Sequence, residues 1–372
     1  MKPMSRNRGK VVVAMSGGVD SSVAALLLKE QGYDVVGLFM RHGTHEPQST
    51  IDHRQSAIRH QGCCSASDAA DARFVAGMLG VPFYALNFEN EFDGLIDYFA
   101  DEYANGRTPN PCVVCNSKLK FGRIADYADA VGATYIATGH YATIQERDGQ
   151  RRLVRARDSQ KDQSYVLFGI GRQMLDRALF PIGELTKTEV RDMARDRGFP
   201  NCDKPDSVEI CFVPDRDYAR VVRHRRPDAF QEGDVVNERG GVIGRHQGVG
   251  HYTIGQRRGL RIALGTPVYV TQISVADRTV TLGRPDGLYR RELIAERVTW
   301  LVDPPTATVK AEVKIRYLHE AAAASIEPLS GDRVRVVFDD PQKAITPGQA
   351  AVIYDGAVVS GGGWICGRAE KD

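Results

Sequence analysis

The chain has 372 residues, of which 42% are hydrophobic and 26% are charged, and its formal net charge is +2. A chain of this length is too long for one ordinary hydrophobic core, so we predict two or three domains. The composition is that of a water-soluble globular protein. No apolar run approaches the roughly 20 residues that a membrane span needs. So small a net charge excludes overall charge as the basis of nucleic-acid binding, and any basic surface must be local.

The N-terminus and the cysteines predict a cytoplasmic protein with no membrane partner. The basic residues 1–10 are followed by an apolar run that ends at Ser16-Gly17-Gly18, which is unlike a signal peptide. Seven cysteines, an odd number, then indicate reduced thiols in a cytosol. These thiols need a catalytic, metal-binding or core role.

The first predicted element is a buried strand over residues 11–14, followed by a glycine-rich loop and a helix from Ser21. Glycine lets backbone N–H groups approach a ligand closely, and the start of a helix binds phosphate through its unpaired N–H groups and its dipole. The stretch therefore predicts a pyrophosphate site, without the Gly-Lys-Ser/Thr ending of a Walker loop. It resembles the PP-loop of ATP pyrophosphatases, which implies that ATP, with Mg²⁺, is cleaved between its α and β phosphates to adenylate a carbonyl oxygen.

Further along the chain, apolar runs and helical periodicity predict an α/β domain with a Rossmann-like parallel sheet. The expected strands cover residues 34–40, 82–88 and 134–138, and the expected helices cover residues 67–79, 91–103 and 118–130. Ligands of such sheets bind beyond the carboxyl ends of the strands. We therefore expect the loops after Ala14, Met40 and Thr138 to converge on one site.

The segment Cys112-Val113-Val114-Cys115 follows a loop with two prolines. A Cys-x-x-Cys pair can be a redox dithiol, half of a metal site, or one functional thiol with a neighbour. We expect Lys118 and Lys120 to lower the pKa of a thiol here, and we favour redox or nucleophilic chemistry.

The competing interpretation of the cysteines is a metal site. Cys63-Cys64 would supply two more sulfur ligands to a four-thiolate zinc or iron–sulfur site. The polar segment over residues 43–61 carries three histidines, and we interpret it as a solvated loop rather than a metal site. Cys202 and Cys366 are interpreted as packing residues.

The periodicity changes after residue 215, where short alternating segments replace helices. Thr186 to Glu189 forms a capping box before this point, and a last basic helix is predicted over residues 217–226. Asp355-Gly356 predicts a hairpin turn, and residues 309–317 alternate as a half-buried strand. We predict a PP-loop catalytic domain over residues 1–215, a small β-rich domain over residues 216–288 and a C-terminal β-barrel over residues 289–372.

Six motifs in order make the chain similar to the bacterial tRNA-specific 2-thiouridylase family. They are Ser16-Gly17-Gly18-Val19-Asp20-Ser21-Ser22, Thr108-Pro109-Asn110-Pro111 with Cys115-Asn116, Ala137-Thr138-Gly139-His140-Tyr141, Lys161-Asp162-Gln163-Ser164-Tyr165, Glu209-Ile210-Cys211-Phe212 and Gly255-Gln256-Arg257-Arg258-Gly259-Leu260. The resemblance implies ATP-dependent 2-thiolation of the wobble uridine, uridine 34, in tRNAs for Lys, Glu and Gln. Cys112 stands where many members have aspartate.

The resemblance also implies roles for individual residues. Cys211 carries a persulfide sulfur from a cysteine desulfurase or sulfur-relay donor protein, Cys115 is the nucleophile, and a transient Cys115–Cys211 disulfide follows. ATP is bound by Ala14, Met15, Ser16, Gly17, Gly18, Val19, Asp20, Ser21, Met40 and Gly139. The target base is bordered by Asn110, Pro111 and Cys112, and the tRNA is contacted by His140, Lys161, Asp162, Gln163, Arg316, Tyr317 and Gln349.

Two rival functions keep the same loop but use it differently. A PP-loop ligase would transfer nitrogen to the adenylated carbonyl and would leave Cys115 and Cys211 without a role. An RNA-binding β protein would only hold the nucleotide. If the sulfurtransferase reading is correct, we predict that the Cys115 loop or the Cys211 segment moves, since Cα atoms more than about 7 Å apart are not bridged by a disulfide.

Overall fold

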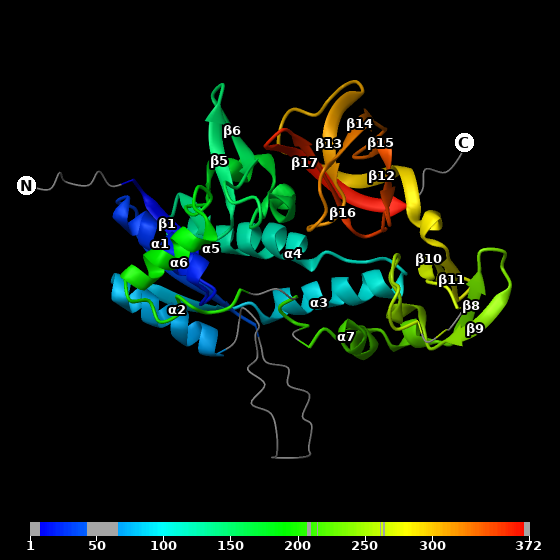
Figure 1. The fold of residues 1–372 in the computed structure, drawn as a ribbon. Helices are drawn as coiled ribbons and strands as arrows, with labels where there is room; N and C mark the ends of the chain where they lie inside the picture. Colours follow the sequence, from blue (N-terminus) through cyan, green and yellow to red (C-terminus); the bar gives the residue numbers. More distant parts are fainter. Residues whose placement is uncertain are drawn as a thin grey trace, which may run out of the picture. The chain divides into compact units, whose positions relative to one another are not determined.

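The computed structural model describes residues 8–42, 66–206, 210–213, 215–260, 262 and 265–367 (Figure 1). Two compact units divide the chain: the first comprises Met1–Gly94, Cys115–Ser164 and Gln173–Arg216, and the second comprises Leu95–Val114, Tyr165–Arg172 and Asp217–Asp372. The histidine-bearing segment over residues 43–61, together with Cys63 and Cys64, lies outside the described residues. Over the ranges described, no helix combines the length and the apolar character that crossing a bilayer requires.

The first unit contains the predicted Rossmann-like parallel sheet. Its strand order is β3-β2-β1-β4-β7, with bounds β1 (Lys10–Ala14), β2 (Asp34–Arg41), β3 (Phe83–Asn87), β4 (Tyr135–Thr138) and β7 (Ala178–Leu179). Val11, Val12 and Val13 are fully buried, as their continuous apolar run predicts for a central strand. Because β1 pairs in parallel with both β2 and β4, the carboxyl ends of these three strands lie together.

The helices mostly follow the predicted ranges. They are α1 (Val19–Glu30), α2 (Ala66–Leu79), α3 (Glu89–Ala104), α4 (Pro111–Val114), α5 (Ile124–Ala130), α6 (Lys187–Asp196) and α7 (Tyr218–Arg225). The capping box of α6 is present as predicted, because the Thr186 side chain accepts from the Glu189 N–H while the Glu189 carboxylate accepts from the Thr186 N–H.

Two parts of the first unit differ from the prediction. Where one α-helix was expected over residues 118–130, the chain forms the π-helix η1 (Cys115–Arg123) and then α5. The polar stretch after Tyr141 forms an unpredicted hairpin of β5 (Ala142–Arg147) and β6 (Gln150–Arg155), whose turn residues Asp148 and Gly149 both have positive φ.

The second unit contains a four-stranded sheet in the order β10-β11-β8-β9. Its strands are β8 (Gly233–Asn237), β9 (Val242–His246), β10 (Tyr269–Ser274) and β11 (Thr279–Gly283). Val235, Val270 and Val280 are among the residues of its buried core. The basic helix α7 precedes it, and the Asp217 carboxylate caps α7 by accepting from the Arg220 N–H.

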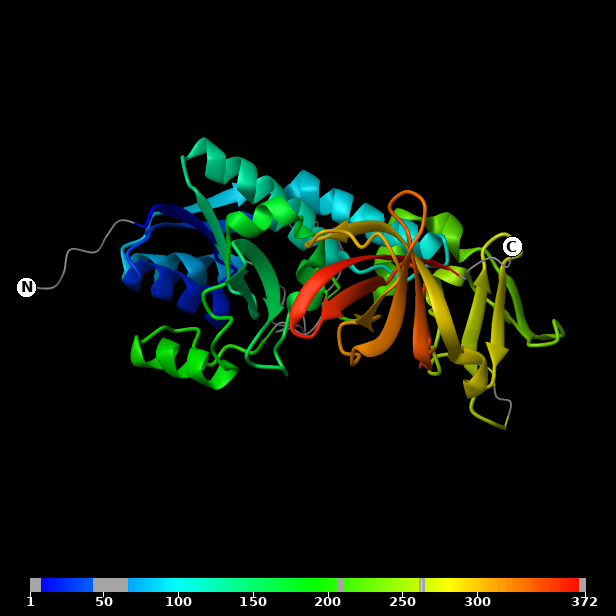
Figure 2. The ribbon, with the colours of Figure 1, turned by 90° about the horizontal axis from the view of Figure 1, so that it is seen from above.

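A closed antiparallel barrel of six strands completes the second unit. Figure 2 shows this part of the chain in yellow-orange to red. The strand order is β12-β15-β14-β13-β16-β17, and β12 pairs with β17 to close the ring. The strands are β12 (Tyr289–Trp300), β13 (Val309–Lys314), β14 (Ala322–Pro328), β15 (Val334–Lys343), β16 (Ala350–Asp355) and β17 (Val358–Gly367).

The predicted fold class is thereby confirmed: a parallel α/β sheet followed by two β-rich parts, the last of them a barrel. The hairpin turn at Asp355-Gly356 is present, with Gly356 at a φ of 57°. The expectation that Cys366 packs in the core is wrong, because this residue of β17 is exposed. The domain boundaries near residues 215 and 289 stay predictions.

Candidate active site

The glycine-rich loop links the carboxyl end of β1 to α1. Three serine hydrogen bonds shape the loop from within: Ser21 Oγ accepts from the Ser16 N–H at 3.1 Å, while the Ser21 and Ser22 hydroxyls donate to the Gly18 carbonyl at 3.1 and 3.0 Å. Gly18 is the N-cap of α1 and supplies no side chain to cap it. The first N–H groups of α1 therefore suit an anion, as the sequence predicts.

Two glycines of this site have no room for a larger residue. Gly17 has a φ of 75°, and a Cβ there would lie 2.2 Å from the Asp68 carbonyl oxygen. A Cβ on Gly139, just after β4, would lie 2.6 Å from the backbone nitrogen of Ser21. The loop after β4 thus touches the start of α1, and Met40 lies at the carboxyl end of the neighbouring β2. The carboxyl ends of the three strands and the loops after Ala14 and Thr138 therefore meet as expected, whereas most of the loop after Met40 lies outside the described residues and its position stays a prediction.

A network of charged side chains surrounds Asp20, in the first turn of α1. Lys187 Nζ lies 2.8 Å from both carboxylate oxygens of Asp20 and 2.7 Å from Oδ1 of Asp206. The Tyr141 hydroxyl donates to Asp20 at 2.8 Å, and the Lys161 amine donates to the second oxygen of Asp206 at 2.8 Å. The predicted tRNA-contacting Lys161 is therefore connected to the predicted ATP-binding Asp20 through Asp206 and Lys187.

The network shifts two ionisation equilibria. Burial alone raises the pKa of Asp206, but hydrogen bonds from Lys161 and Lys187 outweigh it and lower that pKa to about 2. Burial and the nearby Asp20 carboxylate raise the pKa of Tyr141 well above its usual range. At neutral pH, Asp206 is therefore ionised while Tyr141 remains a hydroxyl donor.

A second group of side chains fixes the loop from the other side. The Asn201 amide donates to the Gly17 carbonyl and to Ser22 Oγ, both at 3.0 Å. Lys204 Nζ lies 3.3 Å from the same carbonyl, 2.5 Å from Asp68 and 2.7 Å from Asp71. Sequence reasoning missed Lys187, Asn201 and Lys204 as site residues. Its one signal was the capping box beside Lys187, which predicts a helix but no ligand.

The two predicted catalytic thiols both belong to the first unit. Cys115 is half-buried at the first residue of η1, and Cys211 is half-buried in the short described segment 210–213. Cys112, three residues before Cys115, is exposed and lies on α4 in the second unit. The effect of Lys118 and Lys120 on the Cys115 pKa stays a prediction.

Lys120, on η1, lies beside His140 after β4. Lys120 Nζ is 3.4 Å from His140 Nε2, and His140 Nδ1 is 2.7 Å from Thr138 Oγ1. Burial, followed by the Lys120 charge, holds the His140 pKa well below its usual range. An ammonium group only donates, so the neutral ring accepts at Nε2 and carries its proton at Nδ1. His140 is 7% exposed, and its predicted tRNA contact stays a prediction.

Asp162 and Gln163, which are also predicted to contact tRNA, make hydrogen bonds within the first unit. The Asp162 carboxylate accepts from the Ala156 N–H, the Ser164 N–H and the Ser164 hydroxyl. Gln163 Oε1 accepts from the Tyr141 N–H at 2.9 Å, and the Gln163 N–H donates to the Tyr141 carbonyl. Gln163 thus holds the segment after β4 that carries Tyr141, and Asp162 joins the residue after β6 to Ser164.

The remaining predicted residues lie in the second unit. Pro111 is buried as the first residue of α4, and Asn110 Oδ1 accepts from the Val113 N–H at 3.4 Å. The Gln349 amide, in the barrel, donates to the carbonyls of Thr108 and Pro109 at 3.1 and 3.0 Å. The loop that precedes Cys115 is therefore attached to the barrel turn at Gln349.

Arg316 and Tyr317 follow β13 of the barrel. The Arg316 guanidinium donates to the Lys343 carbonyl at 3.0 Å, and its Nε is buried without a hydrogen-bond partner among the described residues. The Lys314 amine lies 5.8 Å from the centre of the partly exposed Tyr317 ring. A cation beside an aromatic face suits RNA, although the predicted tRNA contact stays a prediction.

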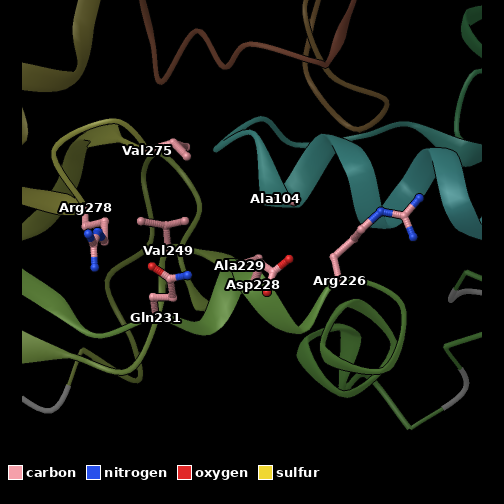
Figure 3. A pocket seen from close by; sticks show the side chains of 8 residues that line it. All are labelled: Ala104, Arg226, Asp228, Ala229, Gln231, Val249, Val275 and Arg278. Atoms are coloured by element: carbon pink, nitrogen blue, oxygen red, sulfur yellow. The ribbon is translucent and has the colours of Figure 1, made fainter.

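The metal interpretation has no support in the described part of the chain, where no group of three or more His, Cys, Asp or Glu side chains could hold a metal ion. Since Cys63 and Cys64 lie outside it, the four-thiolate alternative stays a prediction. A pocket of about 240 Å³ in the second unit (Figure 3) is lined by none of the predicted site residues. Its lining is Ala104, Arg226, Asp228, Ala229, Gln231, Val249, Val275 and Arg278.

Comparisons with known proteins match three family profiles along the chain. A tRNA methyl transferase HUP domain matches residues 9–215, a tRNA methyl transferase PRC-barrel domain matches residues 221–284, and an aminomethyltransferase β-barrel domain matches residues 290–365. The chain is 46% identical over 358 residues to the tRNA-specific 2-thiouridylase MnmA of Clostridium perfringens, covering 96% of this chain and 98% of the relative. It is 47% identical over 361 residues to that of Symbiobacterium thermophilum, covering 96% and 92%.

Proposed function

Because the chain belongs to the tRNA-specific 2-thiouridylase family, we propose that it is an ATP-dependent sulfurtransferase that replaces the C2 oxygen of the wobble uridine, uridine 34, by sulfur in tRNA. The observation that carries the proposal is the joint presence, in one unit, of an uncapped glycine-rich loop at α1 and the half-buried thiols Cys115 and Cys211. The loop suits activation by ATP, and the thiols suit delivery of sulfur.

In the first step, the uridine C2 oxygen attacks the α-phosphorus of ATP, and pyrophosphate leaves. The loop from Ala14 to Ser21 and the start of α1 would hold the departing phosphates, because the N-cap Gly18 supplies no side chain and the Ser21 and Ser22 hydroxyls bond to the Gly18 carbonyl instead of capping the first N–H groups of α1. Met40 and Gly139, at the neighbouring strand ends, would border the nucleotide.

The metal expected with ATP is Mg²⁺, which usually binds one or two carboxylates together with substrate phosphates. The half-buried carboxylate of Asp20, in the first turn of α1, fits such a site. The ion would neutralise phosphate charge. Asp20 would hold it, and Tyr141 would orient the Asp20 carboxylate through its hydrogen bond.

In the second step, the terminal sulfur of a Cys211 persulfide attacks C2 of the adenylated uridine and displaces AMP. The Cys115 thiolate then attacks the Cys211 sulfur, releasing 2-thiouridine and forming a Cys115–Cys211 disulfide. An external dithiol donates two electrons to restore both thiols, and a cysteine desulfurase or sulfur-relay protein reloads Cys211. One of the two cysteine segments moves during this step.

The acceptor would be tRNA for Lys, Glu or Gln, in the cytoplasm. Asn110, Pro111 and Cys112 would border the target base, which must leave its stack to be modified. Pro111 is buried and restricts the backbone there, so this loop suits a flipped-out base. Local cations such as Lys161 and Arg316 would contact the phosphates or bases.

The test is thiolation of unmodified tRNA with ATP and a persulfide donor, measured as 2-thiouridine by mass spectrometry. Cys115→Ser and Cys211→Ser should each abolish the product, whereas Cys366→Ser, at an exposed barrel residue, should leave it unchanged. Cys115→Ser should also trap a tRNA–Cys211 mixed disulfide. Normal product from both site variants, or ammonia incorporation at C2, would refute the proposal.

A further inference from the structure

Lys187 has contacts that its place in a capping box does not explain. It is the first residue of α6, and its side chain is 12% exposed. Its amine lies within 2.8 Å of both oxygens of Asp20 and within 2.7 Å of Asp206 Oδ1. Its backbone N–H donates to the Asp158 carboxylate at 3.0 Å. Both the main chain and the amine of Lys187 are thus held in one position beside the loop.

The position matters because Asp20 adds a negative charge where phosphates would bind. A carboxylate in the first turn of α1 repels a triphosphate unless a cation accompanies it. Around Asp20 and Asp206 the structure places three cations, Lys187, Lys161 and Arg191. Together with Asp158, whose carboxylate accepts from the Lys187 N–H, they form a cluster in which the charges balance. Of the three cations, Lys187 is the one that contacts Asp20 directly.

We propose that Lys187 is a phosphate-binding residue, which turns from Asp20 to the β and γ phosphates of ATP while Asp206 keeps hold of its amine. An ammonium group has three donors, so it can keep one hydrogen bond to Asp206 and give the others to phosphate oxygens. The exchange leaves the Asp20 carboxylate available to Mg²⁺. This inference rests on the proposed use of ATP and adds a residue from α6 to its phosphate site.

The experiment measures binding of α,β-methylene-ATP and of AMP, each with MgCl₂, to the full-length chain by calorimetry. Asp20→Asn is compared with the double variant Asp20→Asn/Lys187→Met, which removes both partners of the ion pair and so leaves no unpaired charge between them. Thermal unfolding checks that each variant is folded. Asp20→Asn/Arg195→Met is the matched control, because Arg195 lies on α6 but is exposed and pairs with Asp192 and Asp203.

Loss of Lys187 should weaken α,β-methylene-ATP binding by about 10- to 100-fold, the range of a hydrogen bond to a charged group, and should change AMP binding by less than about twofold. The Arg195 control should change neither. Lys187→Gln in the wild-type background should likewise weaken the binding of α,β-methylene-ATP relative to that of AMP.

If Lys187 only neutralises Asp20, removing it from the Asp20→Asn chain will have no effect, and the inference is wrong. An equal loss of AMP binding also overturns it, because AMP has no β or γ phosphate. Failure of the wild-type chain to bind the analogue would overturn the proposed function, whereas normal wild-type binding without a loss in the double variant overturns this inference alone.

Discussion

Replacing Gly139 by alanine should disturb the start of α1. The new Cβ would lie 2.6 Å from the Ser21 nitrogen and 2.7 Å from the Asp20 carbonyl carbon, whereas ordinary contact begins at 3.4 Å. These are backbone atoms that cannot rotate away, so the two segments must separate by about 0.8 Å, the difference between 3.4 and 2.6 Å. Overpacking of this kind costs about 1–3 kcal/mol, and we expect the free energy of unfolding to fall by about 2 kcal/mol.

The same displacement should weaken ATP binding, since the N–H groups that would hold phosphate move with Ser21. Urea unfolding gives the stability, and calorimetry with α,β-methylene-ATP gives the affinity, which should fall by at least about tenfold. Gly77→Ala is the control: a Cβ at Gly77, inside α2, meets nothing within 4 Å, and alanine there should stabilise the chain by about 0.5–1 kcal/mol. Unchanged stability and affinity in Gly139→Ala would show that the close approach is not as described.

Three further predictions concern the polar contacts. Gln349→Leu removes both hydrogen bonds to the loop at residues 108–109, so the rate of single-turnover thiolation should fall. The affinity for tRNA, measured by filter binding, should stay within about twofold. Weaker tRNA binding at an unchanged rate would instead indicate that Gln349 contacts tRNA directly. Asp206→Asn should lower the free energy of unfolding by about 1 kcal/mol at pH 7, after allowance for solvent screening. The pKa of Asp206 in the folded chain is lowered to about 2, so its carboxylate stabilises the fold at pH values above its unfolded pKa. The difference in free energy of unfolding between the wild type and Asp206→Asn, measured with urea, should therefore narrow as the pH falls below about 4. A difference that stays constant with pH would refute this. Thr186→Ala should cost about 1 kcal/mol in urea unfolding while Thr186→Ser costs little, and equal losses would argue against the capping box.

The sequence was informative wherever a local pattern dictates the structure. Continuous apolar residues predicted the buried strand β1, and Asp355-Gly356 predicted the last hairpin, because both depend on neighbours along the chain. The Asp148-Gly149 turn carries the same hairpin signal, which polar strand residues obscured. The Lys187–Asp20 pair joins residues 167 positions apart, and no periodicity announces such a contact.

The π-helix η1 was not predictable, because its residues would suit an ordinary α-helix equally well and only the hydrogen-bond pattern distinguishes the two. Site roles were the least accessible part. The family resemblance implies that Lys161, Asp162 and Gln163 contact tRNA, and these contacts stay predictions; the structure adds that their side chains make hydrogen bonds within the first unit. A motif can reflect selection for holding a loop as well as for touching a substrate.

The same π-helix gives the Cys115 segment an unusual tolerance to change in length. A π-helix closes each hydrogen bond over one more residue than an α-helix does, so it can absorb an inserted residue without displacing the helix that follows. Deleting one residue between Cys115 and α5 would allow ordinary α-helical bonding and, by the same argument, would leave Cys115 facing nearly its original direction relative to α5. The segment can therefore lose one residue and keep the direction of this thiol, whereas the same deletion within an α-helix would turn the thiol by about 100° about the helix axis.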